Sequence, residues 1–405
     1  MTSTPPTAIR TSLLARVRRE LFSTPLDSLI SLALVGFLLA VGAAFLHWVL
    51  FQAQWAVIQA NSTLFAVGRY PLEQQWRLWL LTTLLAAASG LSWGLLRSQA
   101  EAWPRNDRLA AAVLIGLAVL GPWALKLTLL IQLRWWLIAA LVLVGRWTTG
   151  RWGQMVPPLT QRLLPLIWPV LYLVGMVLIS GGLGMITVPP GEWGGLLLTL
   201  LESSFAILLC FPLGIVLALG RRSELPLLRW GSVLYIEFIR GAPLITLLFL
   251  GQNILGFLLP GGLAPDRVWR AAWVLTFFAA AYVAEAVRSG LAALPKGQLE
   301  AARSLGLPVH QALIHVVLPQ ALRVALPATV GQFITLLQDT TLLSLIGLLD
   351  LLGTARTVMS NPAFLGKNAE VYLLLAVLFW CCCAALGLGS RALETRLNPL
   401  ATSKA

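Results

Sequence analysis

Charged residues are scarce in this chain, and their scarcity excludes an ordinary soluble domain. Only 11% of the 405 residues are Asp, Glu, Lys or Arg, whereas soluble globular domains carry about 25%. Hydrophobic residues make up 58% of the sequence, and its mean hydropathy is +0.82. Because each membrane-spanning helix requires about 20 mostly apolar residues, the composition predicts an all-α polytopic membrane protein.

Cysteine and histidine are also rare, which excludes several kinds of site. Cys210 and the run at 381–383 lie in apolar stretches and have neither a disulfide framework nor metal-ligand spacing. The three His are scattered, and no Ser/His/Asp, Cys/His or paired-carboxylate arrangement is recognisable. No Gly-x-x-x-x-Gly-Lys-Ser/Thr phosphate loop occurs either. We therefore expect no catalytic residue, no metal, no cofactor bound by this chain and no enzymatic activity of its own.

Long apolar runs predict about ten transmembrane helices. They fall at residues 29–50, 78–96, 109–125, 129–145, 163–187, 195–219, 232–258, 271–287, 324–347 and 371–390. Lys126, Gln132 and Arg134 interrupt the third and fourth, so this region is either a tight helical hairpin or one span with an interfacial segment. No small-residue cleavage site follows the basic segment 1–28, so the first span is expected to be retained.

The basic residues predict the orientation of these spans. Of the 29 Lys and Arg, 20 lie in the terminal segments and the loops after even-numbered spans, and eight lie in the opposite loops. Cytoplasmic loops are enriched in Lys and Arg, so both termini are expected to be cytoplasmic. These loops account for the formal charge of +13. No basic cluster alternates with exposed aromatics, so no nucleic-acid partner is expected.

A polar segment, residues 295–319, separates the eighth and ninth spans. Its distinctive residues are Glu300, Ala301, Ala302, Arg303, Gly306, Leu318 and Pro319. The first four predict a short helix with one polar face and one face of small residues, and the glycine allows a turn. The helix either lies on the bilayer surface or docks onto a second protein, because lipid cannot satisfy its polar groups.

The full pattern of Glu-Ala-Ala, a glycine six positions after the glutamate, and a closing Leu-Pro resembles the permease subunits of bacterial ABC importers. The resemblance is to the polar amino acid family, which includes histidine, glutamate, glutamine and general L-amino acid systems. Val316 stands where the family carries Ile. The resemblance implies that residues 295–319 form a cytoplasmic coupling loop that docks into a groove of a separate ATPase subunit.

Further motifs extend the resemblance over roughly residues 194–396. The stretch 239–244 is similar to the family's Arg-Gly-x-Pro-Leu signature, and 281–290 is similar to Ala-Tyr-x-Ala-Glu-x-x-Arg-Gly-Gly, with Ser289 for the first glycine. The stretch 338–342 is similar to Lys-Asp-Thr-Ser-Leu, with Gln338 for Lys and Thr341 for Ser. The N-terminal half, with Arg69-Tyr70 before residues 71–74, resembles the longer subunits of general L-amino acid and glutamate/glutamine/aspartate/asparagine importers.

The resemblance implies a domain organisation and a set of partners. A basic cytoplasmic segment (1–28) and accessory helices (29–190) precede a core of five helices with the type I importer permease fold (191–396), and a short tail (397–405) follows. The partners implied are ATPase subunits that bind ATP, a second permease chain or another copy, an external amino acid binding protein and membrane lipid. The location implied is the bacterial inner membrane, and acidic and neutral polar amino acids are the expected substrates.

Charged and polar residues within the spans are further candidates, because such residues are costly in a bilayer. Glu237 lies three positions before Arg240, and Glu285 lies three positions before Arg288, so each pair is expected to neutralise its charges. Structural or gating roles are expected for these four residues and for Pro243. Candidates for the substrate pathway are Glu202, Gln252, Asn253, Gln332, Gln338, Asp339 and Thr340. Glu202 either faces a polar cavity or pairs with another helix, such as that of Arg240. The others either line a pathway or form hydrogen bonds between helices.

A self-contained secondary transporter or channel is the alternative function. It requires coupling-ion sites and usually inverted repeats. No convincing repeat relates the two halves of the sequence, and the polar segment 295–319 would have no role.

Overall fold

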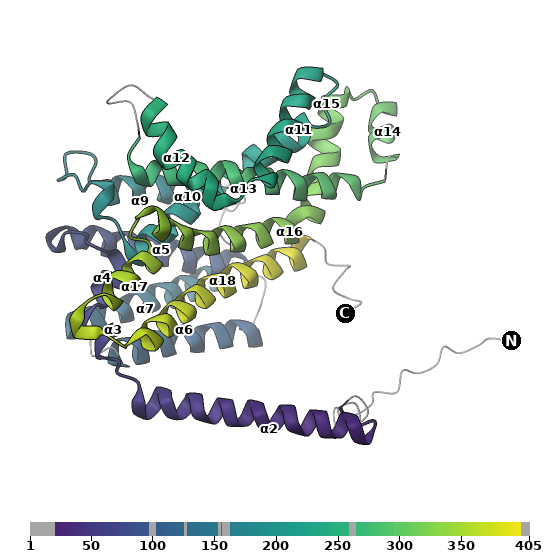
Figure 1. The fold of residues 1–405 in the computed structure, drawn as a ribbon. Coiled ribbons are helices and arrows are strands. Elements are labelled where there is room, and N and C mark those ends of the chain that lie inside the picture. The colour runs from purple at the N-terminus through teal and green to yellow at the C-terminus, as the bar shows by residue number, and fades with distance from the viewer. Residues whose placement is uncertain are drawn as a thin grey trace. The chain divides into compact units, whose positions relative to one another are not determined.

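The computed structural model describes residues 21–96, 103–124, 128–152, 155, 163–258, 265–295 and 297–397. The chain divides into two compact units, Met1–Trp55 and Ala56–Ala405. The described residues form helices and no strand, apart from isolated bridges of Gly68 with Trp193 and of Gly195 with Asp350 (Figure 1). The prediction of an all-α protein is therefore confirmed.

The first unit contains one long apolar helix. Helix α2 (Pro25–His47) continues through a π-helical turn, η1 (Trp48–Gln52). Pro25 occupies the first helical turn, where no backbone donor is required, and the Thr24 hydroxyl caps the helix by accepting from the Asp27 amide at 3.1 Å. Pro25–Gln52 is 28 residues long, and its most apolar 18-residue stretch has a mean hydropathy of 2.6, so it is long and apolar enough to cross a membrane.

The second unit begins with the accessory helices. They are α3 (Ala56–Ala60), α4 (Ser62–Val67), η2 (Leu72–Gln74), α5 (Gln75–Leu96), α6 (Arg105–Ala124), α7 (Leu129–Trp152), η4 (Leu164–Leu166), α9 (Ile167–Ser180) and η5 (Pro190–Glu192). Helices α5 and α7 cross at glycines: a Cβ on Gly90 would lie 2.5 Å from the Val142 carbonyl oxygen, and one on Gly94 would meet Thr149. Gly90 and Gly94 form a Gly-x-x-x-Gly pattern, which lets two membrane helices approach closely.

The core helices follow. They are α10 (Gly195–Gly220), α11 (Pro226–Gly241), α12 (Leu244–Leu258), α13 (Arg267–Ala292), α14 (Gly297–Ser304), α15 (Val309–Ala312), η6 (Leu313–Val317), α16 (Leu318–Asp339), η7 (Thr340–Ile346), α17 (Leu351–Met359), η8 (Pro362–Phe364) and α18 (Asn368–Leu397). Helix α13 is central: it packs against α10 and α16, and α16 packs against α18 (Figure 1). Small residues on α13, among them Ala271, Ala280 and Ala284, are fully buried and permit this close packing.

Residues around the start of α5 contact the end of α9, the loop after it and the start of the core. The Tyr70 hydroxyl donates to the Ile179 carbonyl at 3.0 Å, and Arg77 Nη1 donates to the Ile186 carbonyl at 2.8 Å. Gly68 approaches Gly194 so closely that an added Cβ would lie 2.4 Å from the Gly194 Cα. Gly68 also has a φ of 66°, which glycine adopts without strain.

The spans differ in part from those predicted. Seven helices of the described residues are long and apolar enough to cross a membrane, or eight if α11 and α12 form one bent span. The predicted spans 109–125 and 163–187 fall on α6 and α9, which are not among these. Helix α9 ends at Ser180 because Gly181 adopts the left-handed conformation with φ 84°, so it is shorter than the predicted span.

The predicted span 232–258 falls on two helices and not on one. Helices α11 and α12 meet at an angle of 106° and diverge from the break (Figure 1). The cause is Pro243: the residue before a proline is driven out of the α-helical region, and Ala242 is extended with φ −94° and ψ 138°. The break therefore leaves Arg240 near the end of one helix and Pro243 at the start of the next.

Candidate functional site

The polar segment between α13 and α16 forms a helix followed by a tight turn. Helix α14 ends at Ser304, and the Leu307 amide donates to the Ala302 carbonyl at 3.2 Å across the turn. Gly306 has a φ of 82°, a conformation that glycine adopts far more readily than other residues. A Cβ added to Gly306 would meet nothing within 4 Å. Backbone conformation rather than crowding therefore accounts for glycine at this position.

One face of this segment is packed and the other is open. Ala302 is buried, whereas Glu300, Ala301 and Arg303 are not, and Leu305 is 84% exposed. No ion pair joins Glu300 or Arg303 to another described residue. The open face of the segment therefore presents Leu305 together with two charged side chains that have no ion-pair partner among the described residues.

Short polar contacts hold the segment against the next helix. Gln320 Nε2 on α16 donates to Gln298 Oε1 on α14 at 3.2 Å and to the Val316 carbonyl at 2.9 Å. Helix α16 begins at Leu318, and Pro319 lies in its first turn, where a missing amide donor costs nothing. The residues of the predicted coupling pattern thus occupy one continuous structure between two spans.

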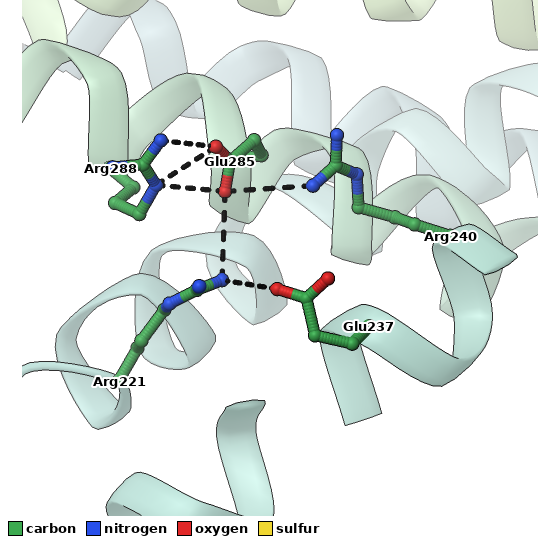
Figure 2. Close-up of polar contacts among 5 residues, drawn as sticks. All are labelled: Arg221, Glu237, Arg240, Glu285 and Arg288. Carbon is green, nitrogen blue, oxygen red and sulfur yellow. Dashed lines mark hydrogen bonds and ion pairs between the residues drawn. The ribbon is translucent and has the colours of Figure 1, made fainter. Parts of the chain in front are cut away.

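Five charged side chains meet near the end of α13 that leads to this segment (Figure 2). Arg288 Nε donates to both Glu285 carboxylate oxygens at 2.9 Å, and its Nη2 also contacts Oε1. Glu285 Oε2 further lies 3.7 Å from Arg221 Nη1 and 3.8 Å from Arg240 Nη1. Arg221 Nη1 in turn lies 3.0 Å from Glu237 Oε1. We call these residues the Glu285 cluster.

The cluster joins three elements and corrects one predicted pair. Arg221 follows α10, Glu237 and Arg240 belong to α11, and Glu285 and Arg288 belong to α13. The pairing of Glu285 with Arg288 is present, but Glu237 pairs with Arg221 and not with Arg240. The reason is tertiary: α11 packs against α13, which places Arg240 beside Glu285 and over the Tyr282 ring at 5.5 Å.

Glu202 lies apart from this cluster and has no positive partner among the described residues. Its side chain on α10 is fully buried, and neither carboxylate oxygen has a hydrogen-bond partner there. The expected pairing with Arg240 is not found. The charged group close enough to interact with it is another acid, Asp350. An unpaired buried carboxyl is costly.

Asp350 itself is a satisfied helix cap. Its carboxylate oxygens accept from the Leu352 amide at 3.1 Å and the Gly353 amide at 3.0 Å at the start of α17. The residue is fully buried. Burial raises the pKa of Asp350 to about 7, although the two amide donors and Arg356 act to lower it. Asp350 is not among the residues predicted from sequence, although the Asp-x-x-Gly spacing before a short helix is a signal for a cap.

The remaining pathway candidates are distributed over three elements. Gln252 on α12 is buried and donates to the Arg267 carbonyl at 2.7 Å, and neighbouring Asn253 is exposed and donates to the Phe249 carbonyl. Gln332, Gln338 and Asp339 lie on α16, and Thr340, in η7, donates to the Leu337 carbonyl. No hydrogen bond or ion pair connects these side chains with one another in the described chain. Gln252 thus makes the interhelical hydrogen bond that was the alternative to pathway lining, and a role for the others stays a prediction.

Comparison with known proteins assigns the family. Residues 210–399 match the model for the binding-protein-dependent transport system inner membrane component. The chain is 33% identical to the inner membrane amino-acid ABC transporter permease protein YhdY of Escherichia coli over 94% of this chain and 92% of that protein. It is 35% identical to the glutamate/glutamine/aspartate/asparagine transport system permease protein BztC of Rhodobacter capsulatus, over 85% of this chain and 79% of that protein.

A solved structure is similar over half of this chain. A crystal structure of an amino acid ABC transporter with histidines is 31% identical, covers 50% of this chain and 92% of that chain, and has a TM-score of 0.45. The two long relatives extend through the accessory helices as well as the core. This chain therefore belongs to the family of amino-acid ABC transporter permease subunits.

Proposed function

We propose that this chain is the membrane-spanning subunit of an ATP-driven importer of polar amino acids, with acidic and neutral polar ones favoured. It receives its substrate from an external binding protein, forms the pore with a second permease chain and is driven by separate ATPase subunits that bind the ATP. The relative BztC, whose name includes glutamate, glutamine, aspartate and asparagine, supports this substrate class.

The observation that carries the proposal is the open face of the polar segment. Leu305 is 84% exposed beside Gly306, between two membrane spans, while Ala302 anchors the same helix. This is the arrangement expected of a coupling loop, residues 295–319, that inserts into a groove of an ATPase. Lys296, within this loop, lies outside the described residues.

The Glu285 cluster supports a route for the coupling. Helix α13 carries Glu285 and Arg288 and leads into α14, and the cluster ties α13 to α10 and α11. When ATP closes the ATPase subunits, displacement of α14 would pull α13, and α13 would carry the other two helices with it. In this mechanism Glu237, Arg240, Glu285 and Arg288 hold the moving helices together, and Pro243 provides the bend.

The distribution of basic residues supports the orientation. With both termini and the coupling loop on the cytoplasmic side of the inner membrane, 20 of the 29 Lys and Arg face the cytoplasm. The proposed division remains a cytoplasmic segment (1–28), accessory helices (29–190), permease core (191–396) and tail (397–405). Residues 1–20 and 398–405 lie outside the described residues.

The test is co-purification of an ATPase from the native membrane with matched variants. Leu305→Glu places a charge on the proposed docking face, whereas Leu365→Glu changes a leucine that is 66% exposed in the loop between α17 and α18. We expect wild type and Leu365→Glu to retain the ATPase. In Leu305→Glu, the amount of co-purified ATPase and the rate of ATP-dependent uptake should each fall at least about tenfold. Uptake into liposomes by the chain alone, without ATP, would instead establish a secondary transporter.

A further inference from the structure

An open apolar groove lies between accessory helices α6 and α7. Its volume is about 300 Å³, and its lining residues are Trp103, Ala111, Ile115, Leu143, Val144 and Trp147. Ile115, Val144 and Trp147 are each about half exposed along it (48%, 55% and 50%). No lining residue is charged, so the groove is unsuited to an amino acid zwitterion, which requires polar partners.

A buried ion pair fixes one end of the groove. Arg146 Nη2 on α7 lies 2.9 Å from Asp107 Oδ2 on α6, and both side chains are almost fully buried (3% and 4% exposed). The guanidinium also lies over the Trp103 ring at 5.2 Å and the Trp93 ring at 5.9 Å. This pair brings the start of α6 to the end of α7 and holds Trp103 in the groove wall.

Two arginines continue the groove beyond this end. Arg108 precedes Ala111 and Ile115 at helical spacing, and Arg151 follows Trp147 one turn later, so both lie on the groove faces of their helices. Both are exposed, and neither has an ion pair or side-chain hydrogen bond with another described residue. The groove thus has an apolar body and a positively charged end.

We infer that this groove binds one anionic phospholipid. An acyl chain lies along Ile115 and Val144, and the anionic head group lies between Arg108 and Arg151. Basic pockets between membrane helices are suited to such head groups. Tryptophans such as Trp103 and Trp147 are enriched at the level of the bilayer where the head groups lie. The lining chemistry favours lipid over a soluble anion, because a free phosphate would leave the six apolar residues without a ligand.

The test measures lipid retained by the full chain in mild detergent by native mass spectrometry. The probes are phosphatidylglycerol, which is anionic, and phosphatidylcholine, which is not. We expect one phosphatidylglycerol to be retained in preference to phosphatidylcholine. Arg108→Gln and Arg151→Gln should each weaken phosphatidylglycerol binding about fivefold and leave phosphatidylcholine unchanged. Arg222→Gln, at another exposed arginine, is the matched control and should change neither.

A second variant tests the acyl chain site. Val144→Trp fills the groove at a residue that is 55% exposed, so the fold has room for the larger ring, and it should reduce binding of both lipids. Equal phosphatidylglycerol retention by wild type and the double variant Arg108→Gln/Arg151→Gln would overturn the inference. So would an equal loss in Arg222→Gln, or complete displacement of the lipid by millimolar glycerol 3-phosphate, which has no acyl chain.

Discussion

Arg240 Nη1 on α11 lies 3.8 Å from Glu285 Oε2 on α13, so the first helix of the bent α11–α12 pair is tied to the helix that precedes the coupling segment. Glu285 accepts from or pairs with three arginines, whereas Glu237 pairs with one. Glu285 is 23% exposed and Glu237 is 56% exposed. The two acids therefore have unequal importance for stability.

Replacing Glu285 should be the more damaging change. Glu285→Gln leaves Arg221, Arg240 and Arg288 without their shared carboxylate, and we expect it to destabilise the protein by about 1–3 kcal/mol and to reduce ATP-coupled uptake. Glu237→Gln is the matched control and should cost less than about 1 kcal/mol, because exposed pairs contribute little. Thermal unfolding in detergent and uptake in proteoliposomes measure both. Equal effects of the two substitutions would refute a central role for Glu285.

Gly306 should tolerate asparagine better than valine. Its φ of 82° is accessible to Asn and strained for a β-branched residue. Gly306→Val should therefore distort the turn and lower ATPase association severalfold, while Gly306→Asn should retain most of it. Pull-down of the ATPase by each variant measures this. If Val and Asn behaved alike, the turn conformation would not matter for docking.

Glu202→Gln should stabilise the protein. The carboxyl is fully buried with no hydrogen-bond partner in the described chain and lies near a second acid, and a neutral amide of the same shape removes the cost of burying charge. We expect a gain of about 1–3 kcal/mol in the free energy of unfolding. Exposed Glu73 provides the control, and Glu73→Gln should change stability by less than about 0.5 kcal/mol. A lower melting temperature for Glu202→Gln would mean that its carboxylate is required.

The stability contributed by Asp350 should decline as pH rises. Its folded pKa of about 7 exceeds the ordinary value of 3.8, so the folded state binds the proton more tightly than the unfolded state does. The free energy of unfolding therefore falls as pH rises from about 4 to about 7 and is level above that. In Asp350→Asn the side chain can still cap the helix but cannot ionise. The melting temperature of this variant relative to wild type should therefore rise as pH rises from about 4 to about 7. Parallel curves for the two proteins would contradict the assignment to Asp350.

The crossing of α5 and α7 should depend on Gly90. A Cβ there would lie 2.5 Å from the Val142 carbonyl oxygen, and backbone cannot easily move away. Gly90→Ala should destabilise the protein by about 1–3 kcal/mol. Gly116 on α6 has no atom within 4 Å of an added Cβ, so Gly116→Ala should be neutral or stabilising. Thermal unfolding compares them, and a neutral Gly90→Ala would show that the helices can separate without cost.

Some features of this protein follow from local sequence and were predictable. The apolar runs determine helices, since a chain in lipid must satisfy its backbone internally. The glycine and proline positions determine local breaks, and the turn at Gly306 was predictable because a glycine just after a short helix commonly adopts the left-handed conformation that ends it. The motifs at 300–319 and 281–290 were sufficient to recognise the amino-acid ABC transporter permeases.

Other features depended on contacts between residues distant in sequence. Only packing of α11 against α13 decided that Arg240 pairs with Glu285, because spacing within one helix favoured Glu237 equally well. The sequence contains the cause of the break in 232–258, which is Pro243, but it does not specify the angle of 106° between the two helices. The isolation of Glu202, the burial of Asp350 and the groove between α6 and α7 belong to the tertiary structure alone. Each depends on which helices become neighbours, and a single sequence contains that information only through the energy of the whole fold.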